Sequence, residues 1–241
     1  MSRDLPEDQA PDKSQAIRRA VRRLWKLVFV PPFVAAIFLL AGTWDWPMGW
    51  VFVGVFFVLG PLVSCVVLIP RQPELVLERT TRRKPVEPWD KVLYPLICVL
   101  GLLIYFVPPL DLRFGWSPAL PGWLAWAAVA VGVLGYLLTI WAMACNAFFA
   151  RIAYVQKDRG HTVATGGPYA IVRHPGYVGV NAMMLAAPII LGSLWTLIPA
   201  GIVVLLVVVR TVFEDQMLHD GLDGYREYAQ RVRYRLVPGV W

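Results

Sequence analysis

Six apolar runs are the feature of this sequence that most restricts its fold. Four of them, residues 24–42, 48–69, 92–110 and 123–150, are close to or above the length of about 20 residues that a helix needs to cross a bilayer. Two shorter runs, 178–191 and 194–209, are separated only by Gly192 and Ser193. At about 1.5 Å per residue each covers roughly 20 to 25 Å, which fits either two thin spans or a tight helical hairpin. The runs predict an all-α integral membrane protein with about six apolar helices, four full spans followed by a C-terminal helical hairpin.

The composition agrees with this class. Apolar side chains make up 58% of the 241 residues and charged ones only 16%, less than a soluble domain of this size carries. We expect one membrane domain over residues 24–241, with its catalytic part at about 150–241. Residues 1–23 are polar and predict a disordered cytoplasmic tail in front of a retained membrane anchor.

The positive charges are distributed very unevenly along the chain. Of the 23 Lys and Arg residues, 22 lie near the N-terminus, in the second and fourth connections between runs, or after Val209. Only Arg113 falls in a connection on the opposite side. This pattern predicts that both termini and residues 161–179 lie in the cytoplasm. The net charge of +7 therefore indicates topology and contact with anionic membrane lipids, and no nucleic-acid partner is predicted.

The cysteines give no sign of a metal site. Cys65, Cys98 and Cys145 all lie within apolar runs and have no paired or metal-type spacing. We interpret them as buried thiols, and no metal ligand is predicted.

The stretch "HTVATGGPYAIVRHPGYVG", residues 161–179, differs from the rest of the chain. Its Gly-Gly-Pro turn lets backbone N–H groups approach a ligand closely. In His174-Pro175, the residue before proline is extended and proline favours the first helical position, so a helix is predicted to start at Pro175. Helix N-termini attract anions, and Arg173 and His174 strengthen such a site. Taken singly, these residue types are also common at membrane interfaces.

A second polar cluster, "RTVFED" at residues 210–215, lies where the last helix leaves the bilayer. Arg210 and Glu214 are four residues apart and share a helix face, so by themselves they predict a simple surface salt bridge. A helical hairpin, however, returns this segment to the side of Pro175. Glu214 and Asp215 point about 100° apart, so only one of them can face a pocket there.

The C-terminal residues predict a short return over this region. The last helix is expected to run to about Asp220, with Gly221 as its left-handed stop. Tyr225, Tyr228 and Val232 have the spacing of an amphipathic helix lying on the membrane surface. The final "YRLVPGVW" is apolar enough to pack back against the bundle.

The motif at 161–179, followed by a hairpin and "RTVFED", resembles the isoprenylcysteine carboxyl methyltransferase family and the related membrane phospholipid methyltransferases. The resemblance covers residues 156–241, and it implies a pocket for S-adenosylmethionine at the cytoplasmic rim. The family's acidic pair of two glutamates is Glu214-Asp215 here, which leaves the role of Asp215 open.

The resemblance also implies roles for individual residues. The family's cofactor contacts fall on Gln156, His161, Thr162, Val163, Ala164, Tyr169, His174, Pro175, Gly176, Tyr177 and Glu214, to which the residue pattern adds Arg173. The arginine that the family places near the acceptor carboxylate corresponds to Arg210.

The expected chemistry is methyl transfer to a lipophilic acceptor taken from the bilayer. A prenylcysteine-type carboxylate is already ionised at neutral pH, so the reaction needs no general base. Three alternatives stay open: a phospholipid N-methyltransferase, an NADPH-dependent sterol-type reductase and a non-enzymatic scaffold or transporter. For the reductase, an Asn is expected before the motif tyrosine, where this chain has Gly176. Transport is disfavoured because the spans carry no charged residue at their centres.

Overall fold

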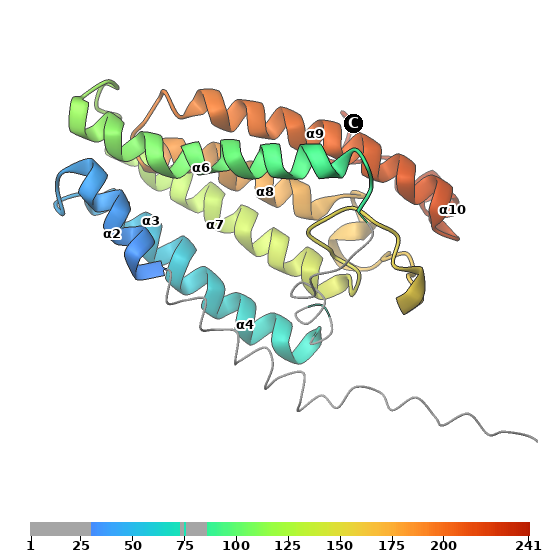
Figure 1. Ribbon diagram of the computed structural model, residues 1–241. Helices are drawn as coiled ribbons and strands as arrows, with labels where there is room; N and C mark the ends of the chain where they lie inside the picture. Colours follow the sequence, from blue (N-terminus) through green and yellow to red (C-terminus); the bar gives the residue numbers. More distant parts are fainter. Residues whose placement is uncertain (1–29, 73–74, 76–85) are drawn as a thin grey trace, which may run out of the picture.

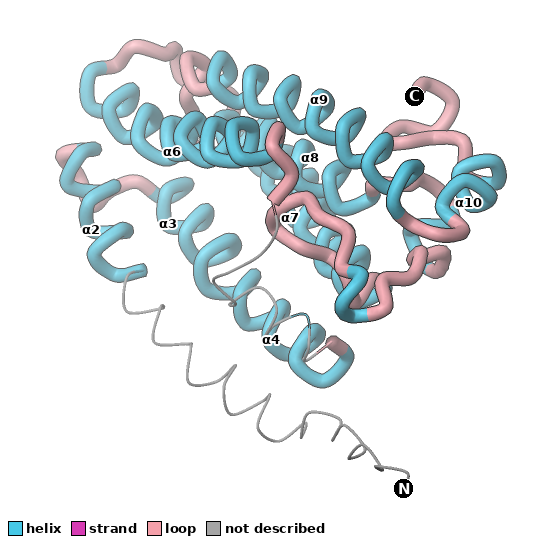
Figure 2. Tube along the Cα trace, turned by 45° about the vertical axis from the view of Figure 1, so that its right-hand side comes forward, coloured by secondary structure: helices cyan, strands magenta, loops and turns pink. Residues whose placement is uncertain are grey.

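The computed structural model describes residues 30–72, 75 and 86–241, and these residues form helices and loops without a strand (Figures 1 and 2). The predicted all-α class is therefore confirmed. The expected tail over residues 1–23 lies outside the described residues.

The described helices form one antiparallel bundle with a loop-rich region at one end (Figure 1). Helix α2 is Val30–Ala41, and the next segment is continuous from Pro47 to Arg71, with α3 (Pro47–Val53), the π-helical η2 (Gly54–Leu59) and α4 (Gly60–Arg71). The remaining long helices are α6 (Asp90–Phe114), α7 (Gly122–Cys145), α8 (Pro175–Ile190) and α9 (Leu197–Gly221). Two single turns, η3 (Lys157–Arg159) and η4 (Gly167–Ala170), and the short α10 (Tyr225–Arg231) complete the chain.

Four helices of the described chain are long and apolar enough to cross a membrane: Pro47–Arg71, α6, α7 and α9. Three of them, Pro47–Arg71, α6 and α7, correspond to expected full spans. Of the first run, 24–42, only α2 is described, so the span expected there lies partly outside the described residues. The last run, expected to be thin, becomes a full-length span because α9 continues beyond Val209 to Gly221. Helix α8, with 16 residues, stays short as expected.

The turns of the bundle gather at the end opposite the loop-rich region. Asp111 near the end of α6 accepts hydrogen bonds from Ser117 Oγ (2.6 Å) and from Ser193 Oγ (2.5 Å) in the α8–α9 turn. These bonds join the α6–α7 and α8–α9 turns. Exposed tryptophans lie in and beside the turns at this end: Trp44, Trp50, Trp116, Trp123, Trp126 and Trp195. Such a group is typical of a membrane–water interface.

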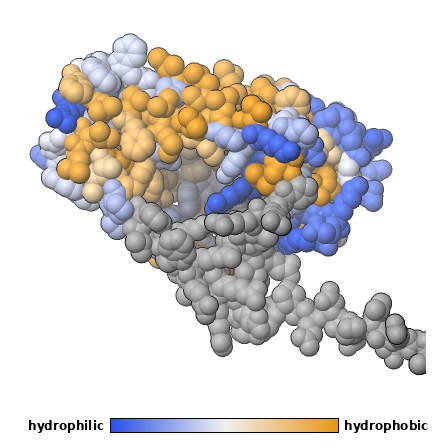
Figure 3. Space-filling model, in the orientation of Figure 1, coloured by the Kyte–Doolittle hydropathy of each residue, from blue (hydrophilic) through white to orange (hydrophobic). Residues whose placement is uncertain are grey.

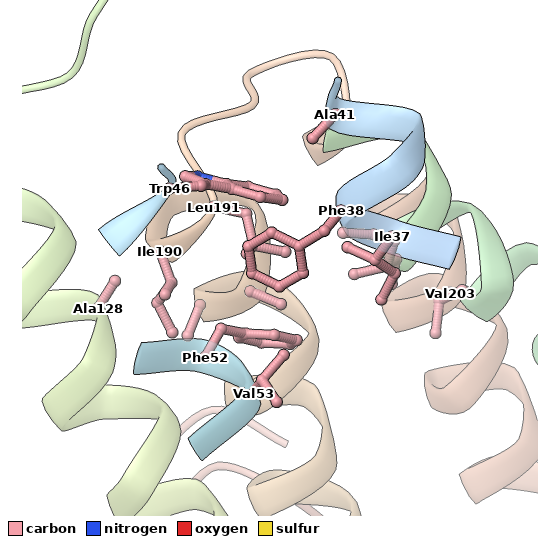
Figure 4. Packing of buried hydrophobic residues seen from close by; sticks show 14 of the residues in the cluster. Ile37, Phe38, Ala41, Trp46, Phe52, Val53, Ala128, Ile190, Leu191 and Val203 are labelled. Atoms are coloured by element: carbon pink, nitrogen blue, oxygen red, sulfur yellow. The ribbon is translucent and has the colours of Figure 1, made fainter. Parts of the chain in front are cut away.

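The distribution of apolar and hydrophilic residues on the surface also agrees with a bundle that lies in a membrane. In the view of Figure 3 the long helices present apolar residues, while the end that carries α10 is hydrophilic. Buried apolar side chains from α2, α3, α7, α8 and α9 meet in a core near the turn end, with Phe38, Phe52 and Ile190 at its centre (Figure 4). The bundle is thus a membrane protein whose polar chemistry is concentrated at one end.

Glycines set the spacing of the two helices that carry the pocket. A Cβ atom at Gly179 would lie 2.3 Å from Gly135 O and from Thr139 Oγ1, and one at Gly135 would lie 2.7 Å from Gly179 O. Helices α7 and α8 therefore pack backbone against backbone, as small residues allow in membrane helices. This contact fixes the start of α8 beside the end of α7.

Candidate active site

A pocket of about 750 Å³, including its open mouth, lies at the polar end of the bundle. It is enclosed by the end of α7, the loop 146–164, the start of α8, the last turns of α9 and helix α10. Ten of the residues predicted from the sequence line it: His161, Thr162, Val163, Ala164, Tyr169, Arg173, His174, Gly176, Tyr177 and Glu214. Gln156, Pro175 and Arg210 are not among the lining residues.

Asn146 shapes the first wall of the pocket. Helix α7 ends at Cys145, five residues before the apolar run does, because Asn146 is extended and its Oδ1 accepts a hydrogen bond from Phe148 N at 2.9 Å. Its Nδ2 donates to Tyr169 Oη at 3.2 Å. The apolar residues 147–150 therefore form a loop over the pocket, and Tyr169 is held against that loop.

Gln156 supports the loop from behind. The residue is fully buried, its Nε2 donates to Phe148 O at 2.8 Å, and its Oε1 accepts from Arg159 Nη1 at 2.5 Å. Its backbone N–H donates to His161 Nδ1 at 3.3 Å. Gln156 thus orders the residues that line the pocket and does not itself reach the cavity.

His161 is a neutral wall of the pocket. Its ring stacks on Phe148 with 4.4 Å between the ring centroids and 29° between their planes. Burial lowers the pKa of His161 to about 4, and the charge of nearby Arg159 lowers it as well. Because Nδ1 accepts the hydrogen bond from Gln156, the proton of the neutral imidazole lies on Nε2.

Helix α8 starts at Pro175, as the His-Pro pair predicted, and brings its first turn to the pocket. A Cβ atom at Gly176 would lie 2.5 Å from the ring of Phe149, so a larger residue at this position would require that ring to move. One residue later, the Tyr177 hydroxyl donates a short hydrogen bond to Glu214 Oε2 on α9. Glu214 therefore faces the pocket, which confirms that one member of the acidic pair does so.

Asp215 is the centre of a buried network beside the pocket. It is 1% exposed and accepts hydrogen bonds from Arg173 Nε (2.8 Å) and Nη2 (2.9 Å) and from Tyr225 Oη (2.8 Å). Arg235 Nε donates to it at 2.9 Å, and His174 Nε2 lies 3.3 Å away. Asp215 thus ties α8, α9, α10 and the C-terminal segment together.

This network changes the expected role of Arg173. The Nε and Nη2 edge of its guanidinium is occupied by Asp215, and Nη1 donates to Val232 O and Arg233 O. The arginine was predicted to strengthen an anion site at the start of α8. In the structure it borders the pocket but neutralises Asp215 instead.

Arg210 lies one turn deeper than Glu214 and is also buried. The i, i+4 spacing taken alone predicts a salt bridge between these two residues, but the ion pair of Arg210 is with Asp90 at the start of α6. Nε donates to Asp90 Oδ1 at 2.7 Å, and Nη2 donates to Asp90 Oδ2 at 3.0 Å and to Arg151 O at 2.8 Å. The guanidinium carbon lies 5.5 Å from the ring centroid of Tyr177, so Arg210 sits behind a wall of the pocket.

The C-terminal return packs back against the bundle as expected, but its helix stop and the placement of its two tyrosines differ from the prediction. Helix α10 buries Tyr225 and Tyr228, and the Tyr228 hydroxyl donates to Tyr169 O at 2.8 Å. Beyond α10, Tyr234 O and Arg235 O accept hydrogen bonds from the backbone of residues 173 and 174. Gly221, expected to be the left-handed stop, is instead the last helical residue, and Gly224 takes the positive φ of 78°.

Sequence reasoning missed Asp90 and underestimated Asp215. Asp90 follows a proline-rich connection, where the local sequence predicts only that a helix begins. A signal existed in the charge count, because Arg210 at membrane depth needs a buried partner and Asp90 is an acid at the boundary of a facing span. Tyr225 and Tyr228, predicted to contact membrane, line the pocket.

The comparison with known families agrees with this site. Residues 123–222 match the phospholipid methyltransferase family. The matched segment contains α7, the pocket loop, α8 and the whole of α9, so the family pattern covers most of the elements that build the pocket. The match confirms the resemblance to membrane methyltransferases and implies methyl transfer at a membrane. No curated protein matches the chain in a search of full sequences.

Proposed function

We propose that this protein transfers the methyl group of S-adenosylmethionine to the carboxylate of a lipophilic acceptor, such as a prenylcysteine-type C-terminus, at the cytoplasmic rim of the membrane. In this proposal both termini lie on the cytoplasmic side. One observation carries it: Glu214 and Arg210 share a face of α9, and both contact Tyr177, which lines the pocket. A carboxylate for the cofactor and a guanidinium for the acceptor are thereby set one helical turn apart.

The described residues fit the proposed cofactor. The ligand carries an ammonium group and ribose hydroxyls, which Glu214 can bind, and a flat adenine, which suits a wall made of Tyr169, Val163 and the His161–Phe148 stack. In the first turn of α8, Pro175 has no N–H and the N–H groups of Tyr177 and Val178 donate to His174 O, so the N–H of Gly176 is the one that would bind an anion such as the ligand carboxylate.

The bound cofactor supplies a methyl group on a positively charged sulfur. In the transfer, an acceptor oxygen would bond to this methyl carbon while the electron pair of the carbon–sulfur bond would stay on sulfur, so the protein would not need to move a proton. The protein's contribution is to hold the two reactants in line, which is worth roughly 7 to 11 kcal/mol. A water-poor site suits this reaction because opposite charges are lost together.

Arg210 supports a carboxylate acceptor because one nitrogen of its guanidinium is not used by the described protein groups. Its Nε and Nη2 are engaged by Asp90 and Arg151, whereas Nη1 makes no hydrogen bond to the described part of the chain. Asp90 fixes the plane of the guanidinium and leaves this one nitrogen for the acceptor. In this proposal Arg210 therefore contacts the acceptor carboxylate through a single nitrogen, Nη1.

A second, shallow hollow adjoins the main pocket. Its lining contains the aromatic pair Trp89 and Phe213 and the polar residues Glu87, Lys157, Gln216 and Asp220. Tyr154 and Met217 border both this hollow and the main pocket. Trp89 and Phe213 stack with 5.4 Å between their ring centroids, and Phe213 is 44% exposed. An apolar acceptor chain can lie against this aromatic pair while its polar end approaches Tyr177.

Phospholipid N-methylation is the second candidate, and two observations favour it. The matched family carries that description, and Asp90 already occupies the edge of Arg210 that would grip a carboxylate. A sterol-type reductase receives no support from the family match.

The test uses the full chain in detergent and then in liposomes. Titration with S-adenosylmethionine should stabilise the protein, by about 2.7 kcal/mol at 100 times the dissociation constant, whereas NADPH should not. Radiolabelled cofactor is then supplied with N-acetyl-S-farnesylcysteine or with phosphatidylethanolamine. Label in a base-labile methyl ester supports the proposal, and label only in the phospholipid headgroup replaces it with the second candidate. Stabilisation by NADPH alone would reject methyl transfer.

A further inference from the structure

Two side chains form the boundary between the main pocket and the shallow hollow beside it. Tyr154 in the loop 146–164 and Met217 on α9 line both spaces, and no other described residue does so. Both residues are half-buried. A molecule that extends from the hollow into the pocket therefore crosses this boundary.

The helix geometry of α9 explains why Met217 borders both spaces. Met217 follows Phe213 by four residues and Glu214 by three, so it shares a helix side with each of them. Phe213 lines only the hollow, and Glu214 lines only the pocket. The neighbours of Met217 follow the same division, because Gln216 lines only the hollow and Leu218 only the pocket. Met217 therefore lies between the two faces of α9.

The proposed reaction requires the acceptor to extend across this boundary. Its apolar chain is placed against Trp89 and Phe213 in the hollow, whereas the cofactor that carries the methyl group is placed in the pocket, beside Tyr177. Arg210 precedes Met217 by seven residues, so it lies on the same side of α9, about 10 Å further along the helix axis. The carboxylate end of the acceptor therefore leaves the hollow along the side of α9 that Met217 and Arg210 share.

The Tyr154 side of the boundary is held in place, and the Met217 side can adjust. The backbone next to Tyr154 is fixed because Ala153 N donates to Asp90 Oδ2 at 2.7 Å and Ala153 O accepts from Glu87 N at 3.1 Å. Methionine is unbranched and has three rotatable bonds, so its side chain adapts to its surroundings. Met217 can thus move aside for a narrow acceptor group, whereas a wider group also needs the anchored loop to move.

We propose that Met217 and Tyr154 select the acceptor by the width of the group next to its carboxylate. This inference rests on the proposed function and goes beyond it, because it names the residues that determine acceptor specificity. A carboxylate on a narrow stem passes between the two side chains and reaches the methyl group. A carboxylate on a more branched carbon is excluded, although its apolar chain still fits the hollow.

Two probes test this selection, N-acetyl-S-farnesylcysteine and N-acetyl-S-farnesyl-α-methylcysteine, which differ by one methyl group on the carbon that carries the carboxylate. The wild type should favour the first probe in kcat/KM. Met217→Ala should reduce this preference by about 10-fold, since one methyl group in a tight apolar site is worth roughly 10- to 200-fold. The inherent effect of the methyl group on reactivity is the same in every variant and cancels in the comparison. Tyr154→Ala widens the boundary from the loop side and should shift the preference in the same direction.

Two neighbouring variants are matched controls. Gln216→Ala changes only the hollow and Leu218→Ala only the pocket, so both should keep the wild-type preference between the probes. Titration with S-adenosylmethionine identifies the folded variants, and a loss of folding in Met217→Ala leaves Tyr154→Ala to decide.

The outcomes separate this inference from the proposed function. A wild type that methylates both probes equally well overturns the inference, and so does an unchanged preference in Met217→Ala and Tyr154→Ala. An equal loss of preference in the Gln216→Ala or Leu218→Ala control also overturns it. Each of these results leaves the proposed function intact. Failure of the wild type to methylate N-acetyl-S-farnesylcysteine rejects the carboxylate acceptor, and this inference with it.

Discussion

Arg210 and Asp90 are 120 positions apart in the chain and form a two-point ion pair at the polar end of the bundle. The pair connects the last span to the start of α6. Asp90 Oδ2 also accepts a hydrogen bond from Ala153 N at 2.7 Å, so the same carboxylate anchors the pocket loop. A residue predicted to act on the acceptor is therefore also a structural link between three segments.

Removing one partner of this pair should destabilise the protein strongly. In Arg210→Met the Asp90 carboxylate stays buried without its counterion, which costs about 3–5 kcal/mol, and Asp90→Leu should cost a similar amount. The double variant should lose much less than the sum of the two. Thermal unfolding of all three variants in one detergent measures this coupling. Additive losses would show that the two side chains do not depend on each other.

The function of Arg210 can then be separated from its structural role. Arg210→Lys keeps a positive charge near Asp90 but loses the planar group that leaves Nη1 for the acceptor. We expect S-adenosylmethionine affinity to be retained and the methyl-transfer rate to fall. Binding calorimetry and a labelled-methyl assay check the two parts, and equal losses in both would contradict a role restricted to the acceptor.

Glu214 is expected to act on the cofactor. Glu214→Gln removes the charge that faces the pocket, which should weaken S-adenosylmethionine binding by about 1.5–3 kcal/mol, or roughly 10- to 150-fold. Tyr177→Phe serves as the matched control, because it removes the hydrogen bond to Glu214 and keeps the carboxylate. Calorimetric titration of both variants decides the point. A larger loss in Tyr177→Phe than in Glu214→Gln would assign the effect to the tyrosine.

Local sequence rules predicted much of the fold and the pocket. The start of α8 at Pro175 follows from the backbone restriction around proline, and the placement of Glu214 beside Tyr177 follows from the hairpin between them. The partner of Arg210 could not be predicted in the same way, because no local pattern relates a residue near the end of the chain to Asp90. The end of α7 depends on a single side chain, Asn146, inside an apolar run whose hydropathy predicts a longer helix.

Asp215 illustrates a different limit of sequence reasoning. Its position beside Glu214 makes it look like a variant member of an acidic pair, whereas the structure shows that it neutralises Arg173 and Arg235. The partners come from two segments on either side of α9, and only their folding together defines the site.

Loss of the Asp215 charge should loosen the C-terminal return. Asp215→Asn leaves two arginines without their counterion, so we expect a loss of stability of about 3–5 kcal/mol. The residues after α10 should then exchange their amide protons faster, because Tyr234 and Arg235 are held to the start of α8 by this network. Hydrogen exchange checks the second effect, with Asp220→Asn, an exposed acid on the same helix, as control. Unchanged exchange after residue 231 would contradict this role.

The neutral state of His161 should make stability depend on pH. The pKa is about 6.5 in the unfolded chain and about 4 in the folded one. Above pH 6.5 both states are neutral and His161 contributes no pH dependence. Between pH 6.5 and 4 the unfolded chain binds a proton that the folded chain excludes, so stability falls as the pH is lowered. His161→Gln should reduce this fall in melting temperature, and His219→Gln, at a partly exposed histidine outside the pocket, serves as the control. Equal pH profiles in wild type and His161→Gln would contradict a depressed pKa.

The topology can be tested at the α8–α9 turn, and the structure determines which residue to use. Ser193 lies at the centre of this turn, but it is fully buried and donates to Asp111, so a cysteine there would be unreactive whatever its side of the membrane. Leu194 is 38% exposed and is the better position. The background is a variant without the native cysteines Cys65, Cys98 and Cys145.

If the basic residues mark the cytoplasmic side, Leu194→Cys should react with an impermeant thiol reagent added outside intact cells. Lys157→Cys, exposed at the pocket end, should react only after the membrane is permeabilised. The two positions lie at opposite ends of the bundle, so their labelling must be complementary if the helices cross the bilayer. Labelling of Lys157→Cys from outside, with Leu194→Cys protected, would place the pocket on the outer face, where S-adenosylmethionine from the cytoplasm could not reach it. Protection of both positions in intact cells would instead show that the α8–α9 turn does not reach the far side.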